Sequence, residues 1–219
     1  MSATDALAGR FASVYTAALT DVLDRRGLRN QTLPPELAAL EAGMRIAGPA
    51  YPVLGHPHPE HEYDASIRRI LSMLGAVPAG HVAVYETGDR SSAHLGELSV
   101  TSLQGRGCAG AVIDGGVRDA DYILRSGFAV FARYATPQDC VRRWELTAHG
   151  DVTIAIGGVR VAPGDWVVGD RDGVVIVPSA LTEEILSEAE EKVALENRIR
   201  DAVRDGVLPL EAYERYGTF

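Results

Sequence analysis

The combination of residues best suited to chemistry is an arginine followed directly by an aspartate, Arg118 and Asp119. An apolar segment, 109–113, precedes the pair and runs into Gly115 and Gly116. We expect a buried strand and then a glycine turn, which would expose the charged pair at the edge of a sheet, where small ligands commonly bind. A cation beside a carboxylate suits an anionic substrate together with a divalent metal ion. The alternative is a surface ion pair that begins a helix.

A second candidate is the segment Gly96–Ser99, with the sequence G-E-L-S. If a helix begins here, its first N–H groups have no partner within the helix and can bind an anion. Gly96 would allow a ligand to approach closely, and Glu97 could orient a water molecule or transfer a proton. The alternative is that these residues only begin a helix and bind no ligand.

The third candidate is Glu196, which lies in a long charged segment expected to be a helix. On a helical projection it falls inside the apolar stripe that contains Ile185, Ile199 and Val203. A carboxylate in such a stripe needs a partner. It could pair with an arginine across an interface, or it could reach an active site, including one in a neighbouring subunit.

The segment 55–64, GHPHPEHEYD, contains three histidines that resemble zinc ligands, namely His56, His58 and His61. Its prolines keep the chain extended, and the sequence offers no second cluster of ligands. We therefore expect a solvated loop at this place.

Composition narrows the class of protein. The chain has 219 residues, is 46% hydrophobic and carries a net charge of −9, which fits a globular domain and argues against a general nucleic-acid binder. It has neither a long apolar stretch nor a secretion signal, and Cys108 and Cys140 are the only cysteines, so we expect a cytoplasmic protein without disulfides. Lys192 is the only lysine. Carbonyl chemistry would therefore more readily use a metal than an imine.

Hydrophobic periodicity and glycine or proline breaks predict the other elements. We expect helices over 11–23, 64–74, 96–106, 118–125 and 181–204, strands over 43–54, 81–86, 109–113, 128–134, 166–168 and 173–177, and a hairpin over 151–161. Strands and helices alternate in the middle of the chain, and a cluster of strands follows. This order favours a single α/β domain with a mixed sheet or two stacked sheets.

Taken together, these residues resemble the RraA-like family. That family contains the 4-hydroxy-4-methyl-2-oxoglutarate / 4-carboxy-4-hydroxy-2-oxoadipate aldolases, which also decarboxylate oxaloacetate, and the regulator of ribonuclease activity A. The resemblance covers nearly the whole chain, and its most specific segments are 16–24, 96–99, 105–119, 128–133 and 157–178. It implies a single α/β/β/α swivelling domain over residues 1–219, assembled as homotrimers or homohexamers. The C-terminal helix, 181–205, would pack on a neighbouring subunit.

The resemblance also implies roles for individual residues. Arg118 would bind the pyruvate part of the substrate, and Asp119 would anchor Mg²⁺ or Mn²⁺, largely through water. The main chain of the second candidate segment would hold substrate oxygens, which involves Gly96, Glu97, Leu98 and Ser99. Glu97 matches a residue that is usually Asp in the family's characterised aldolases, and its extra methylene could shift the water that it holds. Glu196 is the best match for a glutamate that a neighbouring subunit contributes.

The expected function is a divalent-metal-dependent class II pyruvate aldolase, a carbon–carbon lyase. It would cleave 4-hydroxy-2-oxo acids, decarboxylate oxaloacetate, or do both, in each case through the enolate of pyruvate. The alternative is a non-catalytic, protein-binding regulator of ribonuclease activity. Such regulators resemble this chain but typically lack the aspartate after the arginine, so Asp119 favours the enzyme. The expected partner is a small 2-oxo acid, with no nucleic acid and no membrane.

Overall fold

A mixed β-sheet organises the protein, and one long strand, β2 (Ile46–Pro57), joins its two halves. The computed structural model describes residues 2–59 and 62–219. The main order of strands is β1 (Ala38–Ala39), β6 (Val130–Ala135), β5 (Gly110–Val117), β3 (Val82–Glu86), β2, β10 (Trp166–Asp170) and β11 (Gly173–Val177). Two further strands join from the side: β4 (Ala93–Leu95) pairs with β5, and β7 (Trp144–His149) pairs with β2.

The strands β2, β3, β5 and β6 run parallel, whereas β7, β10 and β11 are antiparallel to their neighbours. Parallel strands are typically covered on both faces, and every residue of β5 is buried. The carboxyl ends of β3, β5 and β6 therefore meet at one edge of the sheet. In open α/β sheets this is the edge where ligands bind.

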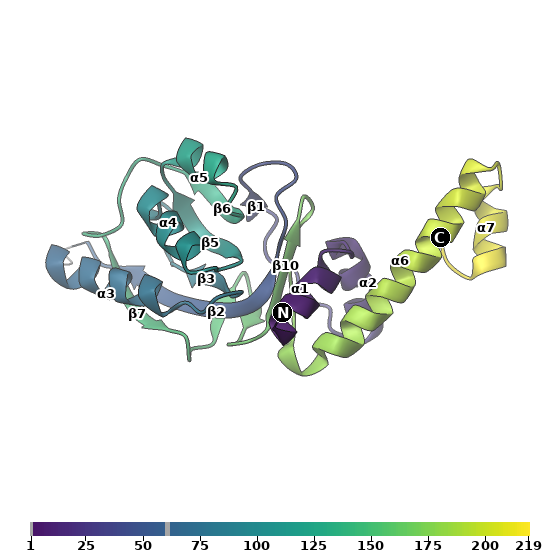
Figure 1. Cartoon of the computed structure of the whole chain (residues 1–219), viewed down its shortest axis with the longest axis horizontal. Helices are drawn as coiled ribbons and strands as arrows, with labels where there is room; N and C mark the ends of the chain where they lie inside the picture. Colours follow the sequence, from purple (N-terminus) through teal and green to yellow (C-terminus); the bar gives the residue numbers. More distant parts are fainter. Residues whose placement is uncertain (1, 60–61) are drawn as a thin grey trace.

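Helices cover the two outer faces (Figure 1). One layer consists of α3 (Tyr63–Ala76), α4 (Glu97–Gly105) and α5 (Ala120–Ser126), and the other of α1 (Ala3–Phe11), α2 (Thr16–Arg25) and the first part of α6 (Thr182–Arg204). The short helix η1 (Ser179–Leu181) leads into α6. The far part of α6 leaves the body of the molecule as an arm, and α7 (Pro209–Tyr216) folds back along it.

Three buried clusters fill the spaces between these layers. Met73 and Leu103 pack with Ile113 between the sheet and the first helical layer. A second cluster lies inside the curved sheet, where the hairpin of β8 (Ile154–Ile156) and β9 (Val159–Val161) contributes its apolar side chains. Phe11 and Trp166 belong to the third cluster, under α1, α2 and α6. This layering confirms the expected α/β/β/α fold with a C-terminal helix.

The expected helix over 11–23 is present as α2, but it begins five residues later than expected because a separate helix, α1, precedes it. Phe11 ends α1, and a new helix begins at Thr16. The buried carboxylate of Asp170 accepts hydrogen bonds from the Thr16 main-chain N–H and hydroxyl, at 2.9 Å and 2.7 Å. A side chain distant in sequence thus fixes the second N-terminus, which periodicity alone does not reveal.

The histidine segment also differs from the expectation. Strand β2 continues to Pro57, because β7 pairs with it and places His56 opposite Glu145. The first part of the expected solvated loop is therefore strand, and His61 lies outside the described residues. Among the helices of residues 2–59 and 62–219, none is both long and apolar enough to cross a membrane.

Candidate functional site

The turn at the end of β5 is formed by the charged pair and not by the glycines before it. β5 continues through Gly115 and Gly116 to Val117, so the expected glycine turn is wrong. These glycines instead permit close packing: a Cβ on Gly116 would lie 2.4 Å from the Tyr134 ring and 2.6 Å from a main-chain oxygen.

Asp119 has an unusual backbone conformation. Its φ is 57° and its ψ is 36°, and it is the one non-glycine residue with positive φ in the described part of the chain. A left-handed conformation costs an ordinary L-residue about 1–2 kcal/mol, although aspartate tolerates it better than most. Such conformations concentrate at functional sites, and this one directs the Asp119 side chain towards α4.

The Asp119 carboxylate lies at the N-terminus of α4. Its Oδ2 accepts a hydrogen bond of 3.1 Å from the main-chain N–H of Glu97. The helix has no cap of its own, because its N-cap residue is Gly96. A Cβ on Gly96 would lie 2.7 Å from Asp119 Oδ2, so the glycine makes room for this contact. Oδ1 makes no hydrogen bond within the described residues, and 41% of the side chain is exposed.

Arg118 is held on two sides. Its main-chain N–H donates to the Leu95 carbonyl at 2.9 Å, which ties the turn to β4. Its guanidinium Nη1 lies 2.9 Å from Asp139 Oδ2, and its Nε lies 3.8 Å from Asp119 Oδ2. One guanidinium therefore contacts two carboxylates while 41% of its side chain stays exposed, so N–H donors remain for an anionic ligand.

Sequence reasoning missed Asp139. It lies in the loop after β6, where its Oδ1 accepts a hydrogen bond of 2.6 Å from the Val141 N–H. The neighbouring Gln138 carbonyl accepts one of 2.7 Å from the Ala93 N–H, so the loop is fixed beside β4. An acidic residue in a polar loop carries no signal of its own, because the contact with Arg118 exists only in the fold.

A cavity of about 250 Å³ opens beside Arg118, and we call it the Arg118 cavity. Its polar lining includes Gly96, Ser99 and Ser102 of the α4 segment, together with Arg118 and Asp139. A second, more open hollow of about 350 Å³ includes Arg118, Asp119 and Thr136. Arg118 thus lies between the two spaces, and Asp119 faces only the second.

His94 is a further residue that sequence reasoning missed. It also lines the Arg118 cavity, although its side chain is fully buried. The ring lies edge-on to Trp144, and Nε2 is 3.4 Å from Asp89 Oδ2. Burial lowers the pKa of His94 to about 4, although Asp89 opposes this shift. His94 is therefore neutral at pH 7 and adds no positive charge to the cavity.

The two candidate proton-transfer residues lie apart from this cavity. The Glu97 side chain lines a different hollow, with Tyr122 and Arg125. Glu196 belongs to α6, and Figure 1 shows α6 on the opposite side of the molecule from α4 and α5. Its Oε1 is 2.8 Å from Lys192 Nζ. Within one chain the structure does not bring Glu196 to Arg118.

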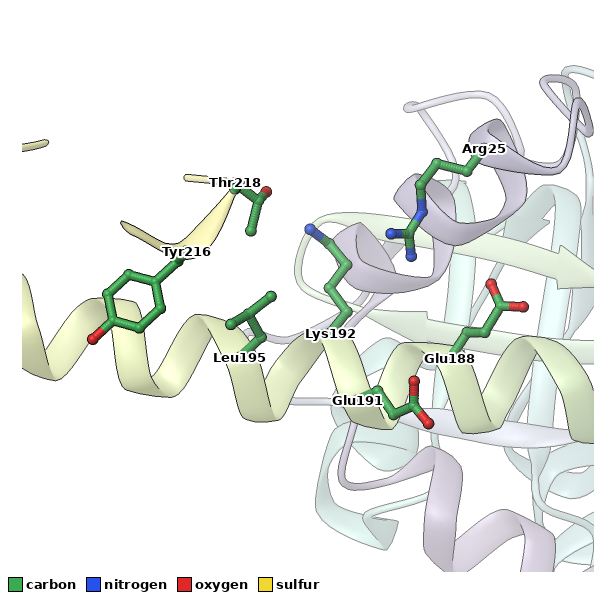
Figure 2. A pocket seen from close by; sticks show the side chains of 8 residues that line it. Arg25, Glu188, Glu191, Lys192, Leu195, Tyr216 and Thr218 are labelled. Carbon is green, nitrogen blue, oxygen red and sulfur yellow. The ribbon is translucent and has the colours of Figure 1, made fainter. Parts of the chain in front are cut away.

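A larger cavity, of about 440 Å³, lies between α2, α6 and the C-terminal tail. Figure 2 shows Arg25 of α2 pointing between Glu188 and Lys192 of α6. Lys192 already pairs with Asp21 at 2.9 Å as well as with Glu196, and Glu188 pairs with Arg26. This cavity does not combine a half-exposed arginine with a carboxylate at a helix N-terminus, so we place the candidate site at Arg118.

Comparison with known proteins now adds to the geometry. Residues 16–176 match the RraA-like family model, described as Aldolase/RraA. The chain belongs to the RraA-like family. A protein of Halalkalibacterium halodurans with the provisional name 4-hydroxy-4-methyl-2-oxoglutarate aldolase is 29% identical over 93% of this chain and 91% of its own length. A protein of Burkholderia mallei with the same provisional name is 30% identical over 70% of this chain and 87% of its own.

Solved structures agree with this membership. Streptomyces coelicolor RraAS2 is described as an unusual member of the RNase ES inhibitor RraA protein family. It superposes with a TM-score of 0.81 at 30% identity, over 90% of this chain and 97% of its own. The RraA-like family thus includes relatives named as enzymes and relatives named as inhibitors.

The carboxylates of this RraA-like chain fit some metals better than others. Among residues 2–59 and 62–219, no group of three or more His, Cys, Asp or Glu side chains could enclose a metal ion. A zinc site normally needs such a group. The uncommitted Oδ1 of Asp119, beside an open hollow, instead fits a hydrated Mg²⁺ or Mn²⁺ ion that keeps most of its water ligands.

Proposed function

We propose that this protein is a divalent-metal-dependent pyruvate aldolase that cleaves 4-hydroxy-2-oxo acids, with oxaloacetate as a substrate for decarboxylation. The observation that carries the proposal is the arrangement at the edge of the sheet. There the Asp119 carboxylate, the Arg118 guanidinium and the first N–H groups of α4 lie together, with Arg118 between the Arg118 cavity and the open hollow that Asp119 faces.

Each of these groups has a definite task in the proposed reaction. Arg118 binds the carboxylate of the 2-oxo acid, which displaces part of its contact with Asp139. The N–H groups of Leu98 and Ser99, in the first turn of α4, are free of helical partners and can hold substrate oxygens. Mg²⁺ or Mn²⁺ at Asp119 would supply positive charge where the enolate develops.

Bond cleavage leaves an electron pair on C3 of the substrate, and this carbon must then take a proton. Glu97 and Glu196 are the proposed residues for positioning the water molecule that supplies it. The Glu97 main-chain N–H already donates to the Asp119 carboxylate at this site.

Glu196 can serve only a neighbouring copy of the chain, and the shape of α6 supports such an assembly. The arm extends beyond the body of the molecule (Figure 1). Its end exposes several large apolar side chains, namely Leu208, Leu210, Tyr213 and Phe219. Apolar groups gathered in this way favour contact with another subunit. The homotrimer or hexamer implied by the family resemblance would provide it.

A non-catalytic regulator of ribonuclease activity is the second candidate, because RraAS2 superposes over nearly its whole length. A pyruvate-release assay separates the two. Purified protein is stripped with EDTA, supplied with Mg²⁺ or Mn²⁺, and assayed on a panel of 4-hydroxy-2-oxo acids and on oxaloacetate. We expect release that vanishes with the chelator and returns with the metal. No release above the metal-only background from any substrate would contradict the proposal and favour the regulator.

A further inference from the structure

The Arg118 cavity has two chemically different walls. One wall carries its polar groups, and the other is a face of α3 with side chains three or four residues apart. This face consists of Tyr63, Ile67, Ile70, Leu71 and Leu74. Such spacing places them on one side of the helix. Leu98 of α4 and Val141 add to the apolar lining.

Several of these side chains are exposed although they are large and apolar. Tyr63 is 46% exposed, Leu71 is 59% exposed and Leu98 is 81% exposed. Single exposed apolar residues are common on protein surfaces, but a group of them around a cavity indicates a binding surface. Ile70 and Leu74 belong to the buried core at the same time, so the wall is held in place by packing.

The charges of the cavity are few. Among its lining residues in the described part of the chain, Arg118 is the one cation and Asp139 the one carboxylate. The neutral His94 adds none. Arg142 lies nearby, with its guanidinium carbon 5.2 Å from the centre of the Tyr63 ring, but it does not line the cavity.

This distribution discriminates between substrates. Arg118 can bind one carboxylate, that of the 2-oxo acid end. A second carboxylate directed at α3 would lose water without gaining a cation, and it would also lie in a cavity that contains Asp139. An alkyl or aryl group in the same place would gain from leaving water.

We propose that α3 forms a subsite for an apolar substituent on C4 of the substrate. The preferred substrates are then 4-hydroxy-2-oxo monocarboxylic acids with an alkyl or aryl group at C4, rather than dicarboxylic acids. This inference rests on the proposed aldolase function, because Arg118 must hold the 2-oxo acid end. In the reaction the C3–C4 bond breaks and its electron pair stays on C3. The 4-hydroxyl proton leaves, C4 becomes the carbonyl carbon of an apolar aldehyde or ketone, and C3 takes a proton to give pyruvate.

A cleavage assay tests the preference. We expect kcat/KM for a 4-alkyl substrate to exceed that for the matched 4-carboxylate substrate by about tenfold or more, as for other apolar pockets. Leu71→Arg adds a cation to the exposed part of the wall and should reduce this ratio by about threefold or more. Ser72→Arg adds the same charge at an exposed residue of α3 outside the cavity and should leave the ratio unchanged. Thermal unfolding of both variants checks that they fold.

The role of Arg142 is tested in the same assay. If the wild-type protein prefers the dicarboxylic substrate and Arg142→Ala abolishes that preference, the subsite binds a carboxylate through Arg142. The proposal is then overturned. An unchanged preference for the alkyl substrate in Arg142→Ala supports it.

Equilibrium binding of acids that cannot be cleaved separates the subsite from the reaction. The ligands are 2-oxobutanoate, 2-oxopentanoate, 2-oxohexanoate and 2-oxoglutarate, which lack the 4-hydroxyl group, titrated calorimetrically in the presence of Mg²⁺. We expect affinity to rise about fourfold per added methylene, and 2-oxoglutarate to bind more weakly than 2-oxopentanoate.

The outcomes are distinguishable. If no substrate is cleaved but affinity rises with the apolar tail, the proposed reaction is wrong and the subsite stands. If affinity is independent of the tail, if 2-oxoglutarate binds at least as tightly as 2-oxopentanoate, or if none of the acids binds, the subsite is wrong whatever the cleavage assay gives.

Discussion

The Asp119 carboxylate caps the helix that begins at Glu97, although the two residues are 22 positions apart in the chain. One side chain therefore completes the N-terminus of α4 and also offers the free oxygen proposed to bind a metal. Stability and activity are coupled at this residue, and different substitutions should separate them.

Replacement of Asp119 by Asn should remove activity while leaving the fold intact. Asn tolerates the left-handed conformation and keeps a side-chain oxygen for the Glu97 N–H, but it loses the charge. We expect kcat/KM to fall by roughly 100-fold or more, since several kcal/mol of charge stabilisation depend on the metal. Asp119→Ala should in addition lower the free energy of unfolding by about 1–2 kcal/mol. Activity and urea unfolding are measured together. Near-normal turnover of Asp119→Asn would exclude it as the metal anchor.

Gly96→Ala should damage the site more than the fold. The new Cβ would lie 2.7 Å from the Asp119 carboxylate and 3.0 Å from the Arg118 side chain, so both side chains must move. We expect kcat/KM to fall by about tenfold or more, and the midpoint of unfolding to change little. Gly105→Ala is the matched control, because a Cβ there meets nothing within 4 Å at the other end of the same helix. It should stabilise the protein slightly and leave activity unchanged.

Arg118→Lys should be severely impaired although the charge is kept. Lysine cannot make the planar two-donor contact with a carboxylate. We expect kcat/KM for oxaloacetate to fall by more than about tenfold, and a loss below about threefold, under roughly 1 kcal/mol, would contradict the proposed role. Asp139→Asn should have a smaller effect, because it only loosens the guanidinium that Asp139 holds at 2.9 Å.

His94 predicts a pH dependence of stability. Burial lowers its pKa in the folded state to about 4, from an ordinary value of 6.5, so between these pH values the unfolded chain binds more protons. The contribution of His94 to the free energy of unfolding is fully present above pH 6.5. It is lost as the pH falls from 6.5 to about 4, by up to about 1.4 kcal/mol per pH unit. When the free energy of unfolding is measured in urea at several pH values, it should depend less steeply on pH in His94→Gln than in the wild type. The same dependence of the free energy of unfolding on pH in the wild type and in His94→Gln would contradict this prediction.

Glu196 should act across a subunit interface. If it does, Arg118→Ala and Glu196→Ala chains expressed together should regain activity, because mixed oligomers contain sites with both residues intact. About one site in three would be intact in each mixed trimeric ring. Two different affinity tags isolate the mixed oligomers. Mixed oligomers no more active than the two parent variants would contradict a role for Glu196 in a neighbouring subunit's site.

The sequence predicted most of the elements around the site, because their signals are local. The strands over 81–86 and 128–134 and the helices over 96–106 and 118–125 appear within a few residues of the expected bounds. In these segments, apolar periodicity and flanking glycines agree with the packing of the fold.

The errors arise where distant residues decide the outcome. Glycine pairs commonly mark turns, but Gly116 pairs with β4 and with β6, so the strand continues past the pair. Neighbouring atoms of Thr87 and Tyr134 leave no room for a Cβ at these positions, so the glycines serve packing instead. The contact of Arg118 with Asp139, and the burial of His94 beside Asp89, likewise depend on loops that only the complete sheet brings together. A single sequence has no local signal for such contacts.

Strand β2 has a consequence for how the chain acquires its structure. It pairs with β3, with β7 and with β10, whose residues lie as late as position 169. During synthesis the two halves of the sheet cannot join until this late strand has left the ribosome. Contacts between such distant segments slow folding, and until then residues 46–49 of β2, which pair with β10, remain an unpaired edge. We expect nascent chains that end before β10 to aggregate, and folding of the full chain to be limited by the docking of the β10–β11 hairpin.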